Sequence, residues 1–404
     1  MKMFSFVEGA HPRRGGLGLT GVPHIIGGVA KLGHTCVLMV SGNIIAGAES
    51  LVKHNIHEAL QNKYGSGTFG IVTYPTYFNW TFAPSLFWQL NGYFRDVDFV
   101  SLHSFYSFPV LVGYLFCRHY HKPYGIWAHG VLAPVQREIS KGKKNIYNLL
   151  IMKHIINNAS LIFYSAIGER EEARPMRYKT QSVIIPHGFN AKDFYTLPSR
   201  GQFRRKYLRG YIGPLVLFLS RLNAKKGLDI LVKAFSIVIK QMPEARLAIV
   251  GSGDPPGFES KVKEWLKASD VVNYSVMPGL LVGAEKLQAF ADADVFVLPS
   301  EAENFGFAVF EAMACRIPIV VSDTLNYAKQ FSDNQTGLIV RREPKAFAKA
   351  ILTLLRNPDL RNEMGQNGLR MARAFSWEEC CRKVEMAIKS ILQNKPFPGE
   401  LYPE

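Results

Sequence analysis

The stretch "VLPSEAENFGFAVFEAMA", Val297 to Ala314, joins a short apolar run to a pattern of helical period. Val297–Ser300 is typical of a buried strand that ends in a turn, and from Phe305 onward apolar residues recur at helical spacing. A strand that passes directly into a helix is the repeating unit of a parallel α/β sheet. The stretch therefore predicts βαβ units.

Short apolar runs and helical patterns alternate along the whole chain of 404 residues. This alternation predicts an α/β protein with two doubly wound, Rossmann-like domains, because a chain of this length exceeds one ordinary core. The clearest expected strands are Val37–Val40, Val97–Leu102, Tyr124–Ala128, Leu161–Tyr164, Val183–Ile185, Leu215–Leu219, Leu247–Val250, Val295–Leu298 and Ile317–Val321.

The series of strands breaks at "TLPSRGQFRRKYLRG", a polar and basic stretch that we interpret as a linker. The expected domains are 1–197 and 198–375. The last helical pattern lies within 376–404, and this C-terminal helix could return to the first domain.

Composition predicts a soluble globular protein of 48% hydrophobic and 20% charged residues. Its formal net charge of +16, more basic in the first half, favours an anionic partner, which could be a phosphate-bearing substrate, an acidic membrane surface or nucleic acid. The five cysteines lack metal-ligand spacing and indicate reduced thiols in the cytoplasm. The most apolar interior stretch, 105–117, falls short of the roughly 20 residues that span a membrane, and the amino terminus lacks a signal-peptide pattern.

Glu303 and Glu311 lie on either side of the expected start of a helix. Anions bind readily at a helix N-terminus, which here would point above the carboxyl edge of the sheet. One carboxylate could bond the hydroxyls of one group and the second those of another, with a diphosphate between them. The residues at this helix start are Asn304, Phe305, Gly306 and Phe307. The alternative is a capped helix whose Glu303 only complements the helix dipole.

The segment "FLSRLNAKKGLDILVKAF", 218–235, places Arg221 and Lys226 between an expected strand and an expected helix. Two fixed cations at this edge of a sheet suit a diphosphate leaving group, whose developing charge they would stabilise. The alternative is a basic loop on a solvated face.

Two glycine-bearing turns also follow expected strands. Gly251, in "IVGSGDPPG", belongs to an incomplete dinucleotide fingerprint that argues against a nicotinamide cofactor, so we interpret it as a turn lining a nucleotide site. Near the amino terminus, Gly15, Gly16 and Gly18 would give flexible backbone that folds over a phosphate or sugar, or would serve the turn alone.

His103 and His129 each end or follow an expected strand, in "VSLHSFYSF" and "YGIWAHGVLAP". Histidines at the ends of neighbouring strands would point into a cleft between the domains, although a lone histidine is often a structural residue.

The segment 141–158 combines Lys141, Lys143, Lys144 and Lys153 with an apolar run. It is interpreted as a helix packed on the sheet or as a contact with anionic lipid head groups.

Taken in order, these motifs resemble the family-4 glycosyltransferases (glycosyl transferases group 1) of GT-B fold, over nearly the whole chain. The residues that carry the resemblance most strongly are "PSEAENFGFAVFEAMACRIPIVVSD" and "SRLNAKKGLDILVKAF". Weaker matches are "RRGGLG", "AHGVLAP", "ADADVFVLPS", "QTGLIV" and "FSWEECCRKV".

The resemblance implies two Rossmann-like domains facing across a cleft and transfer of a sugar from a nucleotide diphosphate donor. It further implies retention of anomeric configuration, no metal, and no cofactor besides the donor as co-substrate. Glu311 would bond the donor ribose, Glu303 the transferred sugar, and Arg221 with Lys226 the diphosphate. His129 would lie at the reacting centre, and His103 is assigned to the acceptor. The leaving phosphate would take the acceptor's proton.

The chain departs from the family pattern in two places. Many members read IPNGVD where this chain has "IPHGFN", with His187 and Asn190. Many also carry a glutamate where Lys329 falls, so one donor contact could be missing or made differently.

Three functions remain open from the sequence. The leading one is a glycosyltransferase of cell-surface polysaccharide or glycolipid biosynthesis, with a saccharide or polyprenyl-linked acceptor and a peripheral contact with the inner, anionic membrane surface left open. The second is a nucleotide-sugar epimerase or other non-transferase enzyme on the same architecture. The third is a nucleic-acid- or membrane-binding protein, and nucleic acid is not expected because the chain has no recognised motif for it.

Overall fold

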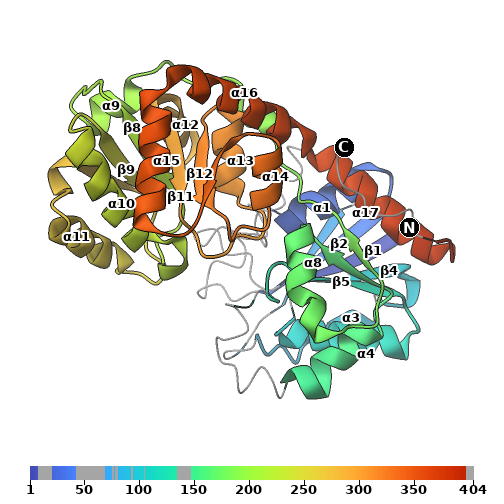
Figure 1. Cartoon of the computed structure of the whole chain (residues 1–404). Coiled ribbons are helices and arrows are strands. Elements are labelled where there is room, and N and C mark those ends of the chain that lie inside the picture. The colour runs from blue at the N-terminus through green and yellow to red at the C-terminus, as the bar shows by residue number, and fades with distance from the viewer. Residues whose placement is uncertain are drawn as a thin grey trace. The chain divides into compact units, whose positions relative to one another are not determined.

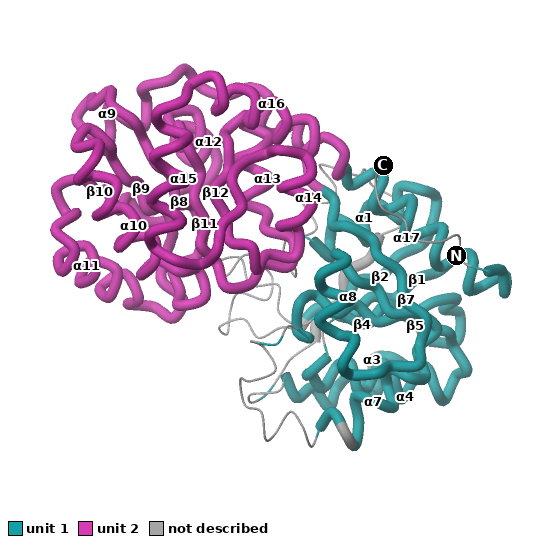
Figure 2. Tube along the Cα trace, viewed as in Figure 1, with its two compact units in different colours: residues 1–188, 376–404 teal, residues 189–375 magenta. Residues whose placement is uncertain are grey.

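The computed structural model describes residues 1–7, 21–41, 69–74, 77, 81–91, 94–103, 105–132, 134 and 147–396 (Figure 1). The chain divides into two compact units (Figure 2). Unit 1 holds Met1–Gly188 together with Ser376–Glu404, and unit 2 holds Phe189–Phe375. Each unit has its own parallel sheet, as the alternating pattern of the sequence predicts.

Unit 1 contains a seven-stranded parallel sheet in the order β3-β2-β1-β4-β5-β6-β7. All residues of the central strands β4, β5 and β6 are buried, as in a sheet covered on both faces. The strands are β1 Lys2–Val7, β2 Thr35–Ser41, β3 Phe69–Tyr74, β4 Phe99–His103, β5 Tyr124–Trp127, β6 Leu161–Tyr164 and β7 Ser182–Ile184. The helices are α1 Gly21–Lys31, α3 Leu86–Asn91, α4 Phe108–His119, α7 Lys153–Asn157, α8 Ile167–Ala173 and α17 Trp377–Leu392, with short turns η1 Phe94–Asp96, η2 Asn148–Met152 and η3 Arg174–Met176.

Unit 2 contains a six-stranded parallel sheet in the order β10-β9-β8-β11-β12-β13. This is the 3-2-1-4-5-6 order of dinucleotide-binding folds, counted within the unit. The strands are β8 Leu215–Leu219, β9 Arg246–Val250, β10 Ser275–Gly279, β11 Val295–Leu298, β12 Ile319–Ser322 and β13 Gly337–Val340. The helices are α9 Gln202–Tyr207, α10 Leu228–Gln241, α11 Phe258–Ala268, α12 Gly283–Asp292, α13 Phe307–Ala314, α14 Ala328–Asp333, α15 Pro344–Arg356 and α16 Pro358–Ala374, with short turns η4 Ala191–Phe194, η5 Ala224–Lys226 and η6 Val272–Tyr274.

The strands named from the sequence are present. Leu161–Tyr164, Leu215–Leu219 and Val295–Leu298 have the predicted bounds, and the other six differ by at most two residues at either end. Strands β1, β3, β10 and β13 are not among the predicted ones. Of these, β3, β10 and β13 are edge strands, whose apolar pattern is weaker because one side pairs with no neighbour.

The expected boundary at 197/198 is wrong in position, because the units divide between Gly188 and Phe189. Phe189 already belongs to unit 2, where its ring packs 6.1 Å from that of Phe310. The stretch interpreted as a linker is also part of unit 2. It forms α9, whose buried Arg204 donates a hydrogen bond of 3.1 Å to Asp294, and the backbone N–H of Arg204 donates to Asp292 at 2.8 Å.

The C-terminal helix α17 belongs to unit 1, where it lies beside α1 (Figure 1). The rings of His24 and Trp377 lie 4.8 Å apart, and His34 Nε2 lies 2.6 Å from Glu385 Oε1. The chain therefore forms unit 1 from both of its ends. All five cysteines are buried and unbridged. No helix in the described part of the chain is both long and apolar enough to cross a membrane.

Candidate active site

The candidate site of unit 2 lies at the carboxyl ends of β8 and β11, which are neighbours at the centre of the sheet. The chain leaves β8 toward β9 on one side, whereas β11 continues toward β12 on the other. Ligands of open α/β sheets bind at such a point, because the loops there diverge and leave a crevice. The loops after these two strands carry the predicted cations and carboxylates.

Backbone contacts hold these two loops together. The N–H of Glu301 donates to the carbonyl of Lys225 at 2.7 Å, and the hydroxyl of Ser300 donates to the same carbonyl at 3.2 Å. Gly227 has a φ of +67°, and a Cβ there would stand 2.1 Å from the carbonyl oxygen of Pro299. Glycine is required at this position because the two backbones approach too closely for a side chain.

Lys226 and Glu303, one from each loop, form an ion pair. Their side chains are 12% and 13% exposed, so solvent screens the pair only in part. The structure thus brings together the cation assigned to the diphosphate and the carboxylate assigned to the sugar. The sequence placed both residues over the same sheet edge, but it carried no signal for the direct pairing.

Glu311 lies within α13 and pairs with Lys286 of α12 at 2.9 Å. Burial raises the pKa of the Glu311 carboxyl above its ordinary value, and the charge and hydrogen bond of Lys286 oppose this shift. Sequence reasoning missed Lys286, which lies on a helix outside every motif. A carboxylate held by one lysine keeps an oxygen available to accept hydrogen bonds from sugar hydroxyls.

Helix α13 begins at Phe307, later than the predicted start at Phe305. Gly306 is its N-cap with φ +80°, and the Phe305 ring is buried in a stack 4.1 Å from that of Phe310. The side chain of Phe305 is therefore core, and only its backbone could meet a donor. Asn304 Oδ1 accepts a hydrogen bond of 3.5 Å from Asn326 in the loop after β12.

Arg221 is exposed and pairs with Asp254 in the loop after β9. Gly251 begins that loop with φ +148°, and a Cβ there would lie 1.8 Å from the carbonyl oxygen of Ser220. The close approach of these two backbones accounts for Gly251, so its contact with a donor remains a prediction. Lys329, noted above as a departure from the family pattern, is exposed and pairs with Asp333 one helical turn away.

The predicted histidines of unit 1 lie against one another. His103 Nδ1 is 2.8 Å from His129 Nε2, and the two rings stack 5.1 Å apart. His187, noted as a departure from the family pattern, stacks 5.5 Å from His129. His129 has a positive φ of +50°, a backbone conformation that non-glycine residues adopt rarely and often at functional sites.

A buried carboxylate that sequence reasoning missed holds the turn after His129. Glu169 accepts hydrogen bonds from the backbone N–H of Gly130 and, at 2.7 Å, from that of Ser165. Burial raises the pKa of Glu169 to about 7, and these hydrogen bonds limit the rise. Asn190, the second departure, donates to Asp193 at the start of η4 and serves a local turn.

Gly15, Gly16 and Gly18 lie outside the described residues, as do Lys141, Lys143 and Lys144. Lys153 begins α7 and is exposed. The predictions made for the three glycines and for the lysine-rich stretch therefore remain predictions.

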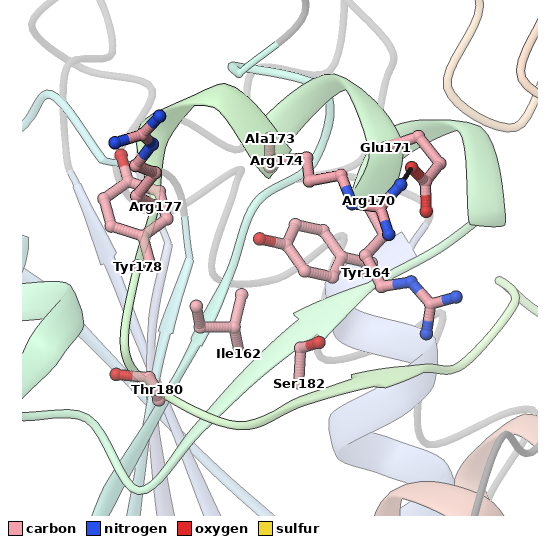
Figure 3. A pocket seen from close by; sticks show the side chains of 10 residues that line it. All are labelled: Ile162, Tyr164, Arg170, Glu171, Ala173, Arg174, Arg177, Tyr178, Thr180 and Ser182. Atoms are coloured by element: carbon pink, nitrogen blue, oxygen red, sulfur yellow. Dashed lines mark hydrogen bonds and ion pairs between the residues drawn. The ribbon is translucent and has the colours of Figure 1, made fainter.

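Unit 1 also holds a cavity of about 280 Å³ between α8 and strands β6 and β7 (Figure 3). Arg174 pairs with Glu171 at 2.8 Å, while Arg170 and Arg177 lie at opposite ends of the view. The guanidinium groups do not converge on one point, so this cavity is a weaker candidate for an anion than the site of unit 2.

Comparison with known proteins agrees with this architecture. HepE of Anabaena, solved in complex with UDP and glucose, superposes with a TM-score of 0.76 at 17% identity, covering 96% of this chain and 100% of that one. Together with the two doubly wound sheets, this likeness assigns the chain to the GT-B fold class.

Residues 199–371 match the family model described as "Glycosyl transferases group 1". The matched residues cover most of unit 2. A D-inositol 3-phosphate glycosyltransferase of Kineococcus radiotolerans is 27% identical over 210 residues, 48% of each chain. A phosphatidyl-myo-inositol mannosyltransferase of Mycobacterium leprae is 28% identical over 215 residues, 52% of this chain and 54% of the relative. The chain thus spans about half the length of these curated relatives, and neither supports the alternative of an epimerase or other non-transferase.

Proposed function

We propose that the protein is a glycosyltransferase that moves a sugar from a nucleotide diphosphate donor to an acceptor hydroxyl. The observation that carries the proposal is the Lys226–Glu303 ion pair at the carboxyl ends of β8 and β11, in the region that matches the group 1 family model. Glu311, paired with Lys286, lies on the helix that follows the loop of Glu303. A cation beside a helix start suits a diphosphate, while two carboxylates suit the hydroxyls of a ribose and a sugar.

The proposed reaction belongs to family 4, with retention of anomeric configuration and without metal. The bond between the anomeric carbon and the diphosphate oxygen breaks, and the acceptor oxygen bonds that carbon on the same face. The leaving phosphate oxygen takes the acceptor's proton. Lys226 and Arg221 stabilise the charge that develops on the diphosphate, and Glu303 orients the sugar, so the protein contributes positioning and electrostatics.

The acceptor that we propose is a saccharide or a polyprenyl-linked saccharide in polysaccharide or glycolipid synthesis. The support is the net charge of +16, which favours an anionic or membrane-attached molecule, with the protein in the cytoplasm at the inner membrane surface. Unchanged activity on a soluble, uncharged acceptor, together with no binding to anionic liposomes, would count against this acceptor class.

The reaction is tested by incubating the purified protein with UDP-, GDP-, ADP- and dTDP-sugars, a mixture of lipid-linked and free saccharides, and EDTA. Proton NMR of the product reads its anomeric configuration. We expect transfer from one nucleotide class, with retention and without loss of rate in the chelator. An inverted product would contradict the retaining mechanism, and complete dependence on added divalent metal would contradict metal independence.

A further inference from the structure

A chain of hydrogen bonds in unit 1 runs from the sheet to His129. Trp127 Nε1 lies 3.1 Å from Ser101 Oγ, which lies 3.1 Å from His103 Nε2. His103 Nδ1 in turn lies 2.8 Å from His129 Nε2. Ser101 and His103 are buried strand residues of β4, and Trp127 ends β5, so the rigid sheet fixes these positions.

His103 and His129, the two histidines of this hydrogen-bonded series, are neutral. Burial, and secondarily the charge of neighbouring histidines, lowers the pKa of His103 to about 3 and that of His129 well below its ordinary value. A neutral imidazole has one N–H and one acceptor nitrogen. The position of its proton therefore decides which neighbour it donates to.

Which atom donates and which accepts in each of these hydrogen bonds follows from Trp127. The indole N–H of Trp127 only donates, so Ser101 Oγ accepts from it. The proton of the Ser101 hydroxyl then needs an acceptor, because leaving a buried donor without a hydrogen bond is unfavourable. Within the described part of the chain, His103 Nε2 is the one acceptor hydrogen-bonded to Ser101 Oγ. His103 Nε2 is consequently the unprotonated nitrogen.

The remaining protons are then determined in turn. His103 carries its proton on Nδ1 and donates it to His129 Nε2. His129 must therefore carry its own proton on Nδ1. This atom is buried and has no hydrogen-bond partner among the residues that the structure describes.

We propose that Ser101 and Trp127, acting through His103, fix the tautomer of His129 so that its Nδ1 carries the proton and donates a hydrogen bond to an oxygen of the substrate. His129 then acts as a neutral, fixed hydrogen-bond donor, and neither gains nor loses a proton during transfer. Ser101, Trp127 and His103 are positioning residues. The assignment of a substrate oxygen as acceptor of this bond rests on the proposed function, whereas the tautomer itself does not.

The tautomer is measured by NMR of protein labelled with ¹⁵N-histidine, which distinguishes a protonated from an unprotonated ring nitrogen. In the unliganded wild-type protein we expect His129 to be protonated on Nδ1 and unprotonated on Nε2. Ser101→Ala removes the hydroxyl that sets the direction, so both tautomers of His129 become populated. Protonation on Nε2 in the wild type, or an unchanged tautomer in Ser101→Ala, would overturn the proposal.

Transfer kinetics provide the second readout. Ser101→Ala should lower kcat about tenfold with little change in the donor KM, and Ser101→Thr, which keeps a hydroxyl, should restore most of it. Ser5→Ala is the matched control, because Ser5 is the register partner of Ser101 on β1 and its buried hydroxyl makes no hydrogen bond among the described residues. We expect Ser5→Ala to behave as the wild type in both readouts. If His129 has the expected tautomer but the wild-type protein transfers no sugar, the proposed function fails. The fixing of the tautomer by Ser101, Trp127 and His103 would still hold.

Discussion

Lys226 and Glu303 form an ion pair that joins the loop after β8 to the loop after β11. These strands are the central neighbours of the unit 2 sheet, so the pair stands where such folds bind ligands. The pair is partly buried, and under the proposed function a bound sugar diphosphate would engage both of its charges. The pair therefore links the packing of the two loops to the proposed chemistry.

We expect Lys226→Ala and Glu303→Ala each to lower kcat/KM for transfer by roughly 100-fold, which corresponds to about 2.7 kcal/mol of transition-state stabilisation. The double variant should lose less than the sum of both, because the two residues act together. Steady-state kinetics of the four proteins gives this coupling. The exposed pair of Lys206 and Glu285 is the control, and its removal should leave kcat/KM unchanged. Additive losses at Lys226 and Glu303 would mean that they act independently.

Gly306→Ala should weaken donor binding without unfolding the protein. A Cβ at Gly306 meets Val309 at 3.4 Å, which is ordinary contact, so the cost is mainly the left-handed backbone, about 1–2 kcal/mol. Calorimetric titration with the donor should show its Kd raised at least tenfold, because the added methyl group lies at the start of α13, where we expect the donor to approach the backbone. Gly257→Ala is the matched control, since Gly257 caps α11 with φ +89° in open space. An equal Kd in both variants would argue against a ligand at Gly306.

Lys286→Met should make donor binding depend on pH. Burial raises the pKa of Glu311 and Lys286 opposes that rise, so removing the lysine raises the pKa further. A protonated Glu311 accepts hydrogen bonds less well, and affinity should fall as the pH drops and recover as it rises. Titrations between pH 5 and 9 measure this, with the exposed Lys240→Met on α10 as control. Parallel pH profiles for wild type and Lys286→Met would contradict a role for Glu311 in binding.

Glu169 should reduce the stability of the fold as the pH rises. Its pKa is about 7 in the folded protein against an ordinary value of 4.5, so the folded state binds more protons between these values. The free energy of unfolding should therefore fall from about pH 4.5 through pH 7, by roughly 3 kcal/mol from this group. His103 has a lowered pKa, so its contribution to the free energy of unfolding rises with pH below about pH 6.5.

Denaturant unfolding of wild type and Glu169→Gln across this pH range separates the two effects. The difference between their unfolding free energies should change with pH, because the histidines contribute equally to both proteins. Glu171→Gln, at a half-exposed residue paired with Arg174, should show no such change. A constant difference between wild type and Glu169→Gln would show that Glu169 has an ordinary pKa.

Much of this fold can be predicted from the sequence because its central strands are continuous apolar runs. β8 and β11 are almost entirely buried and have the predicted bounds, whereas β10, an edge strand with the sequence SVMPG, has no fully buried residue and was missed. The unit boundary was placed too late because a polar, basic composition concealed that Arg204 is buried against Asp292 and Asp294.

The candidate site, like the fold, could be predicted only in part from the sequence. Glu303, Glu311 and Lys226 could be proposed from the sequence because each lies in a dense motif where a strand passes into a helix. Lys286 and Glu169 were missed because side-chain pairing across helices has no fixed spacing in sequence. The ring of Phe305 is buried in the core, stacked on that of Phe310. The spacing of apolar residues alone does not show which way the side chain of a residue before a helix points.

The central claim is that Glu303, Glu311 and Lys226 form a nucleotide-sugar site. Thermal unfolding of the wild type, Glu311→Ala and the control Glu285→Ala with UDP-, GDP-, ADP- and dTDP-sugars in EDTA tests it most directly. A donor at 100 times its Kd stabilises a protein by about 2.7 kcal/mol, which is measurable. We predict a rise in melting temperature with one nucleotide class in the wild type and Glu285→Ala, and none in Glu311→Ala. No rise with any donor, or an equal rise in Glu311→Ala, would contradict the account.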